Sequence, residues 1–143
     1  MRRLAFSCLV GIVTSTLAMG LIFGMLAYFG IGPIGQFINV TIPQIISGQS
    51  FDDKSFELMH QGLVFSWLVI LPLSSLIGSL VGVSISPAQR PWVGLAAAMP
   101  MVIMALLGKS DGVLRVLSAL SCLAIGVVVG YIGEFLWIKR ATT

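Results

Sequence analysis

The chain has 143 residues, of which 57% are hydrophobic and only 9% charged, and its mean hydropathy is +1.06. Because a soluble domain has about 25% charged residues, this composition excludes an ordinary soluble protein and is typical of a polytopic membrane protein. The net charge is +3, and half of the eight basic residues stand at the two ends of the sequence. That pattern is membrane-flanking charge, so we expect no nucleic-acid partner.

The first apolar segment covers residues 4–29 and follows Arg2 and Arg3 without a further charge. Its 26 residues are enough to cross a membrane with some tilt. A signal peptide is the alternative, but its apolar core has only about 7 to 15 residues. The segment therefore predicts a first transmembrane helix that is retained.

The segment from 30 to 62 is different, because glycines, prolines and amides interrupt its apolar residues and its later part is charged. A helix beginning at Pro33 would carry isoleucines on one side and amides on the other. We therefore expect an interfacial amphipathic or re-entrant helix, followed by a polar stretch in which Ser50 is the predicted helix N-cap. Residues 30–62 together are predicted to form the external loop.

Three further apolar segments follow, at 63–85, 92–107 and 116–138, and the first two of them carry no charge. The segments 63–85 and 92–107 each have a proline near the middle, Pro72 and Pro100 respectively. The fold class predicted is an all-α integral membrane protein with four transmembrane helices, forming a single membrane domain over residues 1–143.

The basic residues divide unequally between the two sides that four spans define. Five lie on the side of the termini, and three, Lys54, Lys109 and Arg115, lie on the other. By the positive-inside rule, both termini are predicted to be cytoplasmic, in the cell inner membrane.

Small residues recur every four positions in three of the spans, which is the pattern of close helix packing in lipid. We expect these rows to contact other helices of the chain or other subunits. The predicted packing residues are Gly20 and Gly24 in the first span, Ser74, Gly78 and Gly82 in the second, and Gly126 and Gly130 in the fourth. Thr16, Ser86, Ser118 and Cys122 extend these rows.

Glu134 is the one carboxylate inside a predicted span. An acid in this position is a candidate for ion or proton coupling. The alternative is that it lies at the headgroup boundary and pairs with a cation such as Arg90, Arg3 or Arg140.

The two central prolines are candidate breaks along a transport pathway. Each removes a backbone donor and frees the carbonyl four residues earlier, at Leu68 and Ala96. Broken helices can line a binding site at the midplane, although proline kinks also occur in membrane helices that transport nothing.

No catalytic, metal or cofactor motif is found in the sequence. Its single histidine, His60, and two separated cysteines, Cys8 and Cys122, cannot supply a zinc or bis-histidine haem site. Glu57 and His60 have the spacing of a carboxylate di-metal motif, which needs a second copy that the sequence lacks.

The expected function is that of a non-enzymatic accessory or assembly subunit of a membrane complex, with membrane lipids and other subunits or further copies of itself as partners. The alternative is a small homo-oligomeric transporter or channel for an ion or small solute, in which Glu134 and the breaks at Pro72 and Pro100 line the pathway. A membrane enzyme ranks third, because no nucleophile and base pair can be identified.

Overall fold

The computed structural model describes residues 2–48, 50, 52–86, 90–108 and 111–141, with side chains described up to residue 137. Every element within these ranges is helical. The α-helices are α1 (Arg2–Phe29), α2 (Gly32–Gln36), α3 (Ile42–Ile46), α4 (Asp53–Phe65), α5 (Leu71–Ile85), α6 (Arg90–Leu107) and α7 (Gly112–Ala141), and two π-helical segments are η1 (Phe37–Thr41) and η2 (Ser66–Ile70).

Four helices are long and apolar enough to cross a membrane. They are α1, the continuous helix formed by α4, η2 and α5, and the helices α6 and α7. The predicted all-α fold with four helices of membrane-spanning length is therefore confirmed, and the fold is compatible with a membrane-embedded protein.

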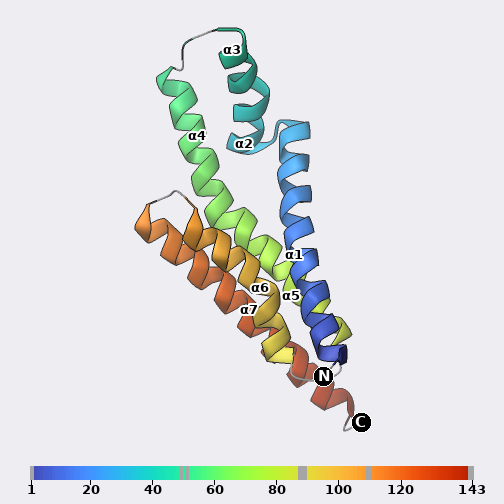
Figure 1. Ribbon diagram of the computed structural model, residues 1–143. Coiled ribbons are helices and arrows are strands. Elements are labelled where there is room, and N and C mark those ends of the chain that lie inside the picture. The colour runs from blue at the N-terminus through green and yellow to red at the C-terminus, as the bar shows by residue number, and fades with distance from the viewer. Residues whose placement is uncertain (1, 49, 51, 87–89, 109–110, 142–143) are drawn as a thin grey trace.

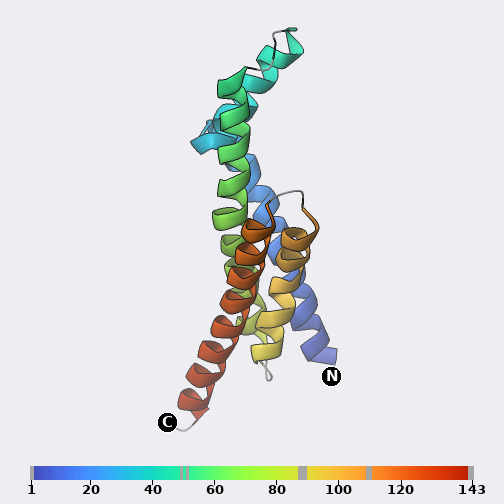
Figure 2. The same cartoon turned by 90° about the vertical axis from the view of Figure 1, so that its left-hand side faces the viewer.

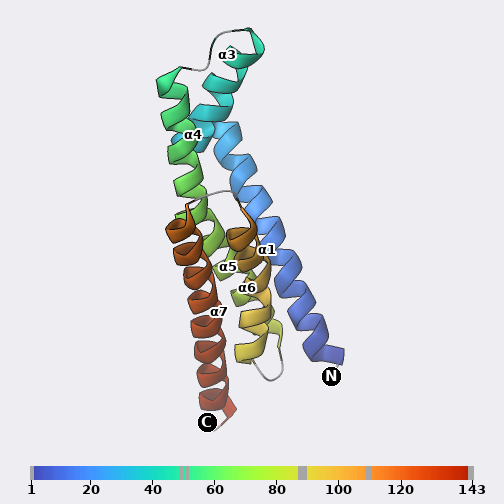
Figure 3. The same cartoon turned by 60° about the vertical axis from the view of Figure 1, so that its left-hand side comes forward.

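The helices form an elongated bundle in which α5, α6 and α7 pack together and α1 lies against α5 and α6 (Figure 1). The beginning of α1 and the end of α7 lie at the same end of the bundle, as the turned view also shows (Figure 2). The α3 helix and the beginning of α4 project beyond the opposite end of the α6–α7 pair (Figure 3).

The segment between the first two spans is a helical hairpin and not an open loop. One arm runs through α2, η1 and α3, and the other is α4, against which α2 packs. At the base of the hairpin, Gly30 and Gly32 have positive φ angles of 65° and 67°, which glycine adopts readily. A Cβ atom on Gly35 would lie 2.7 Å from the Cα atom of Gly30, so the turn out of α1 is tightly packed.

The second spanning helix begins ten residues before the predicted boundary at 63. The apolar segment is preceded by the charged residues Asp53, Lys54 and Glu57. Backbone hydrogen bonds do not require apolar side chains, so the helix already includes this polar stretch at its N-terminal end. Its N-cap is Asp52 and not the predicted Ser50, because a carboxylate oxygen of Asp52 accepts a hydrogen bond of 2.9 Å from the Ser55 backbone N–H.

Both π-helical segments immediately precede an α-helix with proline at its second position, Pro43 after η1 and Pro72 after η2. In each, the residue before the proline donates its N–H five residues back, from Ile42 to Phe37 and from Leu71 to Ser66. The wider turn accommodates the proline without ending the helix. Pro100 instead lies inside α6, which continues as an α-helix through it.

Candidate functional site

The contact between α1 and α5 is made by small residues at close range. A Cβ atom on Gly78 would lie 2.7 Å from the Gly11 carbonyl oxygen and 2.9 Å from the Ser15 Cα atom. A Cβ atom on Gly82 would lie 3.2 Å from the Gly11 Cα atom. A side chain at Gly78 would therefore push α1 away from α5, and Gly82 is tightly packed against the same helix.

The contact between α6 and α7 has the same character. A Cβ atom on Gly126 would lie 2.7 Å from the Gly94 carbonyl oxygen, and one on Gly130 would lie 2.5 Å from the Pro91 Cα atom. Ala98 also meets Gly126. The predicted rows of the second and fourth spans thus lie at contacts between helices of this chain.

In α1, the small residues that pack against other helices are not the ones that the sequence pattern predicts. Gly20 and Gly24 have no heavy atom within 4 Å of an added Cβ, beyond their own helix and chain neighbours, and Thr16 is exposed. The buried residues of α1 are Ser7, Gly11, Ser15 and Ala18. Ser7, Gly11 and Ser15 have the same four-residue spacing as Thr16, Gly20 and Gly24, so spacing alone does not show which of the two rows meets α5.

Buried serines join the spanning helices through hydroxyl groups. Ser75 donates to the Cys122 carbonyl (3.2 Å), Ser79 to the Gly94 carbonyl (3.1 Å) and Ser118 to the Trp67 carbonyl (2.6 Å). Ser74 of the predicted row is also buried, but it donates within its own helix, to Ile70. Among the described residues, every buried side-chain nitrogen or oxygen atom has a hydrogen-bond partner. The hydroxyls of Ser75, Ser79 and Ser118 therefore join neighbouring helices of the bundle.

Glu134 lies near the terminal end of the bundle. It is one turn beyond Gly130, which packs against Pro91 at the beginning of α6. Since α6 and α7 are antiparallel, Glu134 and Pro100 are separated by about 20 Å along the bundle at 1.5 Å per residue. Glu134 is partly exposed, and within the described side chains no cation lies within ion-pair distance of it. The expected pairing with Arg90 or Arg3 is therefore not formed; the side chain of Arg140 lies outside the described residues.

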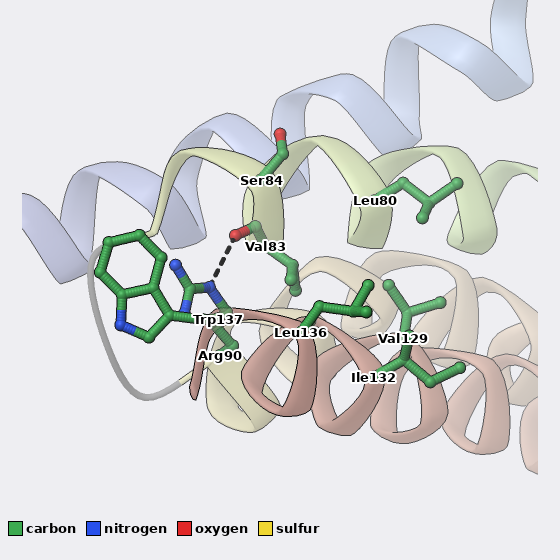
Figure 4. Close-up of a pocket in the computed structure, with 9 residues that line it drawn as sticks. Leu80, Val83, Ser84, Arg90, Val129, Ile132, Leu136 and Trp137 are labelled. Atoms are coloured by element: carbon green, nitrogen blue, oxygen red, sulfur yellow. Dashed lines mark hydrogen bonds between the residues drawn. The ribbon is translucent and has the colours of Figure 1, made fainter. Parts of the chain in front are cut away.

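Arg90, which the sequence suggested only as a membrane-flanking charge or as a partner of Glu134, has a different set of contacts. It is the first residue of α6 and only 6% exposed. Its Nε–H donates to the Val83 carbonyl oxygen at 3.4 Å, and its guanidinium carbon lies 4.4 Å from the centre of the Trp137 indole ring (Figure 4). The side chain therefore links the end of α5 to α7 through a cation–π contact.

A groove of about 390 Å³ begins at Arg90 and is open to the outside of the bundle. Its lining residues come from α5, α6 and α7: Leu80, Val83, Ser84, Arg90, Val129, Ile132, Gly133, Leu136 and Trp137. Figure 4 shows Arg90 and Trp137 at one end, with Leu80, Val129 and Ile132 toward the other. The groove thus has a cationic end and apolar walls.

A second groove, of about 530 Å³, lies at the opposite end of the α6–α7 pair. It separates α4 from the α6–α7 turn and combines the side chains of His60, Asp111 and Arg115 with apolar ones. Neither groove is lined by Pro72 or Pro100, the candidate pathway breaks.

Glu57 and His60 are both exposed on α4, and Glu57 accepts a hydrogen bond of 2.9 Å from the Gln61 side chain. The described part of the chain contains no cluster of three or more histidine, cysteine, aspartate or glutamate residues that could hold a metal ion. Cys8 and Cys122 are free thiols.

Three comparisons with known proteins give no relatives: no family model, curated protein or solved structure matches this chain.

Proposed function

We propose that this protein is a non-enzymatic, multi-pass membrane protein that acts as an accessory or assembly subunit of a membrane complex. The observation that carries the proposal is the contrast between two small-residue rows on α1. Ser7, Gly11 and Ser15 are buried against the bundle, whereas Gly20 and Gly24 face open space.

Small residues have no packing advantage against lipid, because their benefit in a membrane is the close approach of a second helix. Only 17% of the spanning part of α1 is buried, against 22% for that of α7 and 44% for those of α4–α5 and of α6. The half of α1 that contains Gly20 and Gly24 therefore offers a surface suited to close packing with a helix of another subunit.

The proposed location is the cell inner membrane with both termini cytoplasmic, which follows from the excess of basic residues on that side. In this arrangement the hairpin of α2, η1, α3 and α4 is external. Its first arm is the proposed interfacial helix, with Val40 and Ile46 exposed at 51% and 80% and with Gln36, Asn39 and Gln44 also exposed.

The experiment is to purify the full chain from its native membrane in mild detergent and to measure the mass and composition of the complex. We expect a heterologous membrane subunit in fixed stoichiometry. Gly24→Leu should release it, because the added side chain blocks close helix approach. The matched control is Leu120→Phe, which adds bulk to an exposed residue of α7 and should leave the complex intact.

Thermal unfolding of both variants shows whether the chain remains folded. A monomeric wild type, or equal effects of the two substitutions in folded protein, would contradict the proposal. A pure homo-oligomer would favour the alternative, a small transporter or channel using Glu134, Pro72 and Pro100. The geometry supports that alternative less, since Glu134 lies about 20 Å along the bundle from Pro100.

A further inference from the structure

The groove between α5 and α7 has the polarity of an amphipathic ligand. Its walls are apolar side chains that are still half exposed, including Leu80 (52%), Ile132 (54%) and Leu136 (53%). At one end the walls give way to the Arg90 guanidinium and the Trp137 ring (Figure 4). A ligand that fills the groove therefore needs an apolar chain and a polar end group.

The charge at the polar end requires an anion. Only 6% of Arg90 is exposed. Its polar contacts among the described residues are the neutral Val83 carbonyl and the Trp137 ring. Among the described residues, no carboxylate lies within ion-pair distance of it. A buried cation at the membrane boundary is costly unless it is paired, and arginine binds phosphate through parallel N–H donors.

The position of the groove identifies the source of that anion. It opens on the outer surface of α5 and α7, two helices of membrane-spanning length and composition, so its apolar walls face the lipid. Tryptophan is enriched at the headgroup level, and Trp137 stands at the polar end. Arg2 and Arg3 are exposed at the same end of the bundle, and basic residues near a membrane surface attract anionic lipid.

We propose that this groove binds an anionic phospholipid, with the phosphate at Arg90 and Trp137 and an acyl chain along Leu80 and Ile132. The site is independent of the Gly20 and Gly24 surface, so it stands or fails separately from the proposed function. Its volume of about 390 Å³ is within the roughly 300 to 1,000 Å³ of ligand sites.

The test uses the indole beside the groove as a reporter of brominated lipid. The full chain is reconstituted in phosphatidylcholine vesicles containing an equal fraction of either brominated phosphatidylglycerol or brominated phosphatidylcholine. Trp92→Phe leaves Trp137 as the lipid-accessible indole, since Trp67 is buried. The matched control is Trp137→Phe, which leaves Trp92, an exposed residue of α6 outside the groove.

We expect brominated phosphatidylglycerol to quench Trp137 with about a fivefold preference over brominated phosphatidylcholine, and Trp92 with none. Arg90→Gln, which removes the charge, should abolish the preference. If Arg90→Gln does not fold, Leu80→Phe is the substitute variant. It fills the groove from its exposed wall and should also abolish the preference. Added inorganic phosphate should leave the quenching unchanged.

Equal quenching of Trp137 by the two lipids, in protein whose groove residues are unchanged, would by itself overturn the proposal. The same holds if the preference persists in folded Arg90→Gln or Leu80→Phe, or if Trp92 shows an equal preference. Reversal by inorganic phosphate would assign the site to a soluble anion and overturn its assignment to a lipid.

Discussion

The Ser118 hydroxyl of α7 donates a hydrogen bond of 2.6 Å to the Trp67 carbonyl oxygen in the π-helical segment η2. Within that segment, the Leu71 N–H bonds to the Ser66 carbonyl, one residue earlier than in an α-helix. The wider turn thus takes away the α-helical donor of Trp67, and α7 supplies a replacement. The proline-associated irregularity is stabilised by a neighbouring helix and is part of the packed core.

Ser118→Ala should therefore destabilise the fold by about 0.6 to 1.7 kcal/mol, from the average to the largest value measured for hydrogen bonds between membrane helices. The measurement is reversible unfolding in detergent micelles. Ser121→Ala is the control, because Ser121 is exposed and donates only to Leu117 of its own helix. An equal loss in the two variants would mean that the bond to Trp67 contributes nothing.

Gly78→Ala should destabilise the bundle by about 1 to 3 kcal/mol, because the added methyl group overlaps Ser15 and the Gly11 carbonyl of α1. Gly20→Ala adds the same atom where nothing lies within 4 Å, so the fold should be unchanged or slightly stabilised. The midpoint of thermal unfolding of the purified chain distinguishes them. Similar midpoints would show that α1 and α5 separate freely.

Acid should loosen the first turn of α4. Hydrogen bonds from the Ser55 side chain and backbone N–H hold the pKa of Asp52 below its usual value. Because this pKa is lower in the folded than in the unfolded state, the stabilisation is present above the unfolded pKa and is lost as the pH falls through the folded one. Amide protection of Ser55 should decrease below about pH 4.

Hydrogen exchange corrected for the intrinsic effect of pH measures that change. Asp52→Asn keeps a capping oxygen that does not titrate, so its protection should be independent of pH over the same interval. A decrease of the same size in Asp52→Asn would assign the effect to another group.

Orientation can be tested with cysteines in a background lacking Cys8 and Cys122. An impermeant thiol reagent should label Lys54→Cys, at an exposed position of α4, from outside intact cells. It should label Thr142→Cys only after the cells are opened, because the excess of basic residues on the side of the termini predicts that this side is cytoplasmic. External labelling of Thr142→Cys would invert the proposed topology.

Glu134→Gln separates ion coupling from a structural role. Since Glu134 lies by the beginning of α6 and far from Pro100, we expect the variant to assemble as the wild type does and to keep the activity of its complex. The assays are the mass of the complex and cell growth that depends on the complex. Loss of activity in a fully assembled complex would favour ion or proton coupling.

The four spans could be predicted because uncharged runs of sufficient length have few alternatives in a membrane protein. The boundaries were less predictable where charge and helix do not coincide. The sequence places the second span at residue 63, where the charges end, but the helix starts at Asp53 because α2 packs against α4 and Asp52 caps it.

The helix contacts were predictable by residue type but not by face. Ser7, Gly11 and Ser15 form as regular a row as Thr16, Gly20 and Gly24, and only the three-dimensional arrangement shows which of the two meets α5. The groove at Arg90 was not predictable, because its lining residues come from three helices that are separated in the sequence.

The close contact of Gly11 with Gly78 also imposes an order in time. α1 is made before the α5 and α6 residues that cover its small-residue face. During that interval the face of Ser7, Gly11 and Ser15 has none of its final neighbours. α6 and α7, by contrast, are joined by a short turn and can pair as soon as both are made. During synthesis α1 therefore waits for α5 and α6 with its packing face uncovered, whereas α7 follows its partner α6 directly.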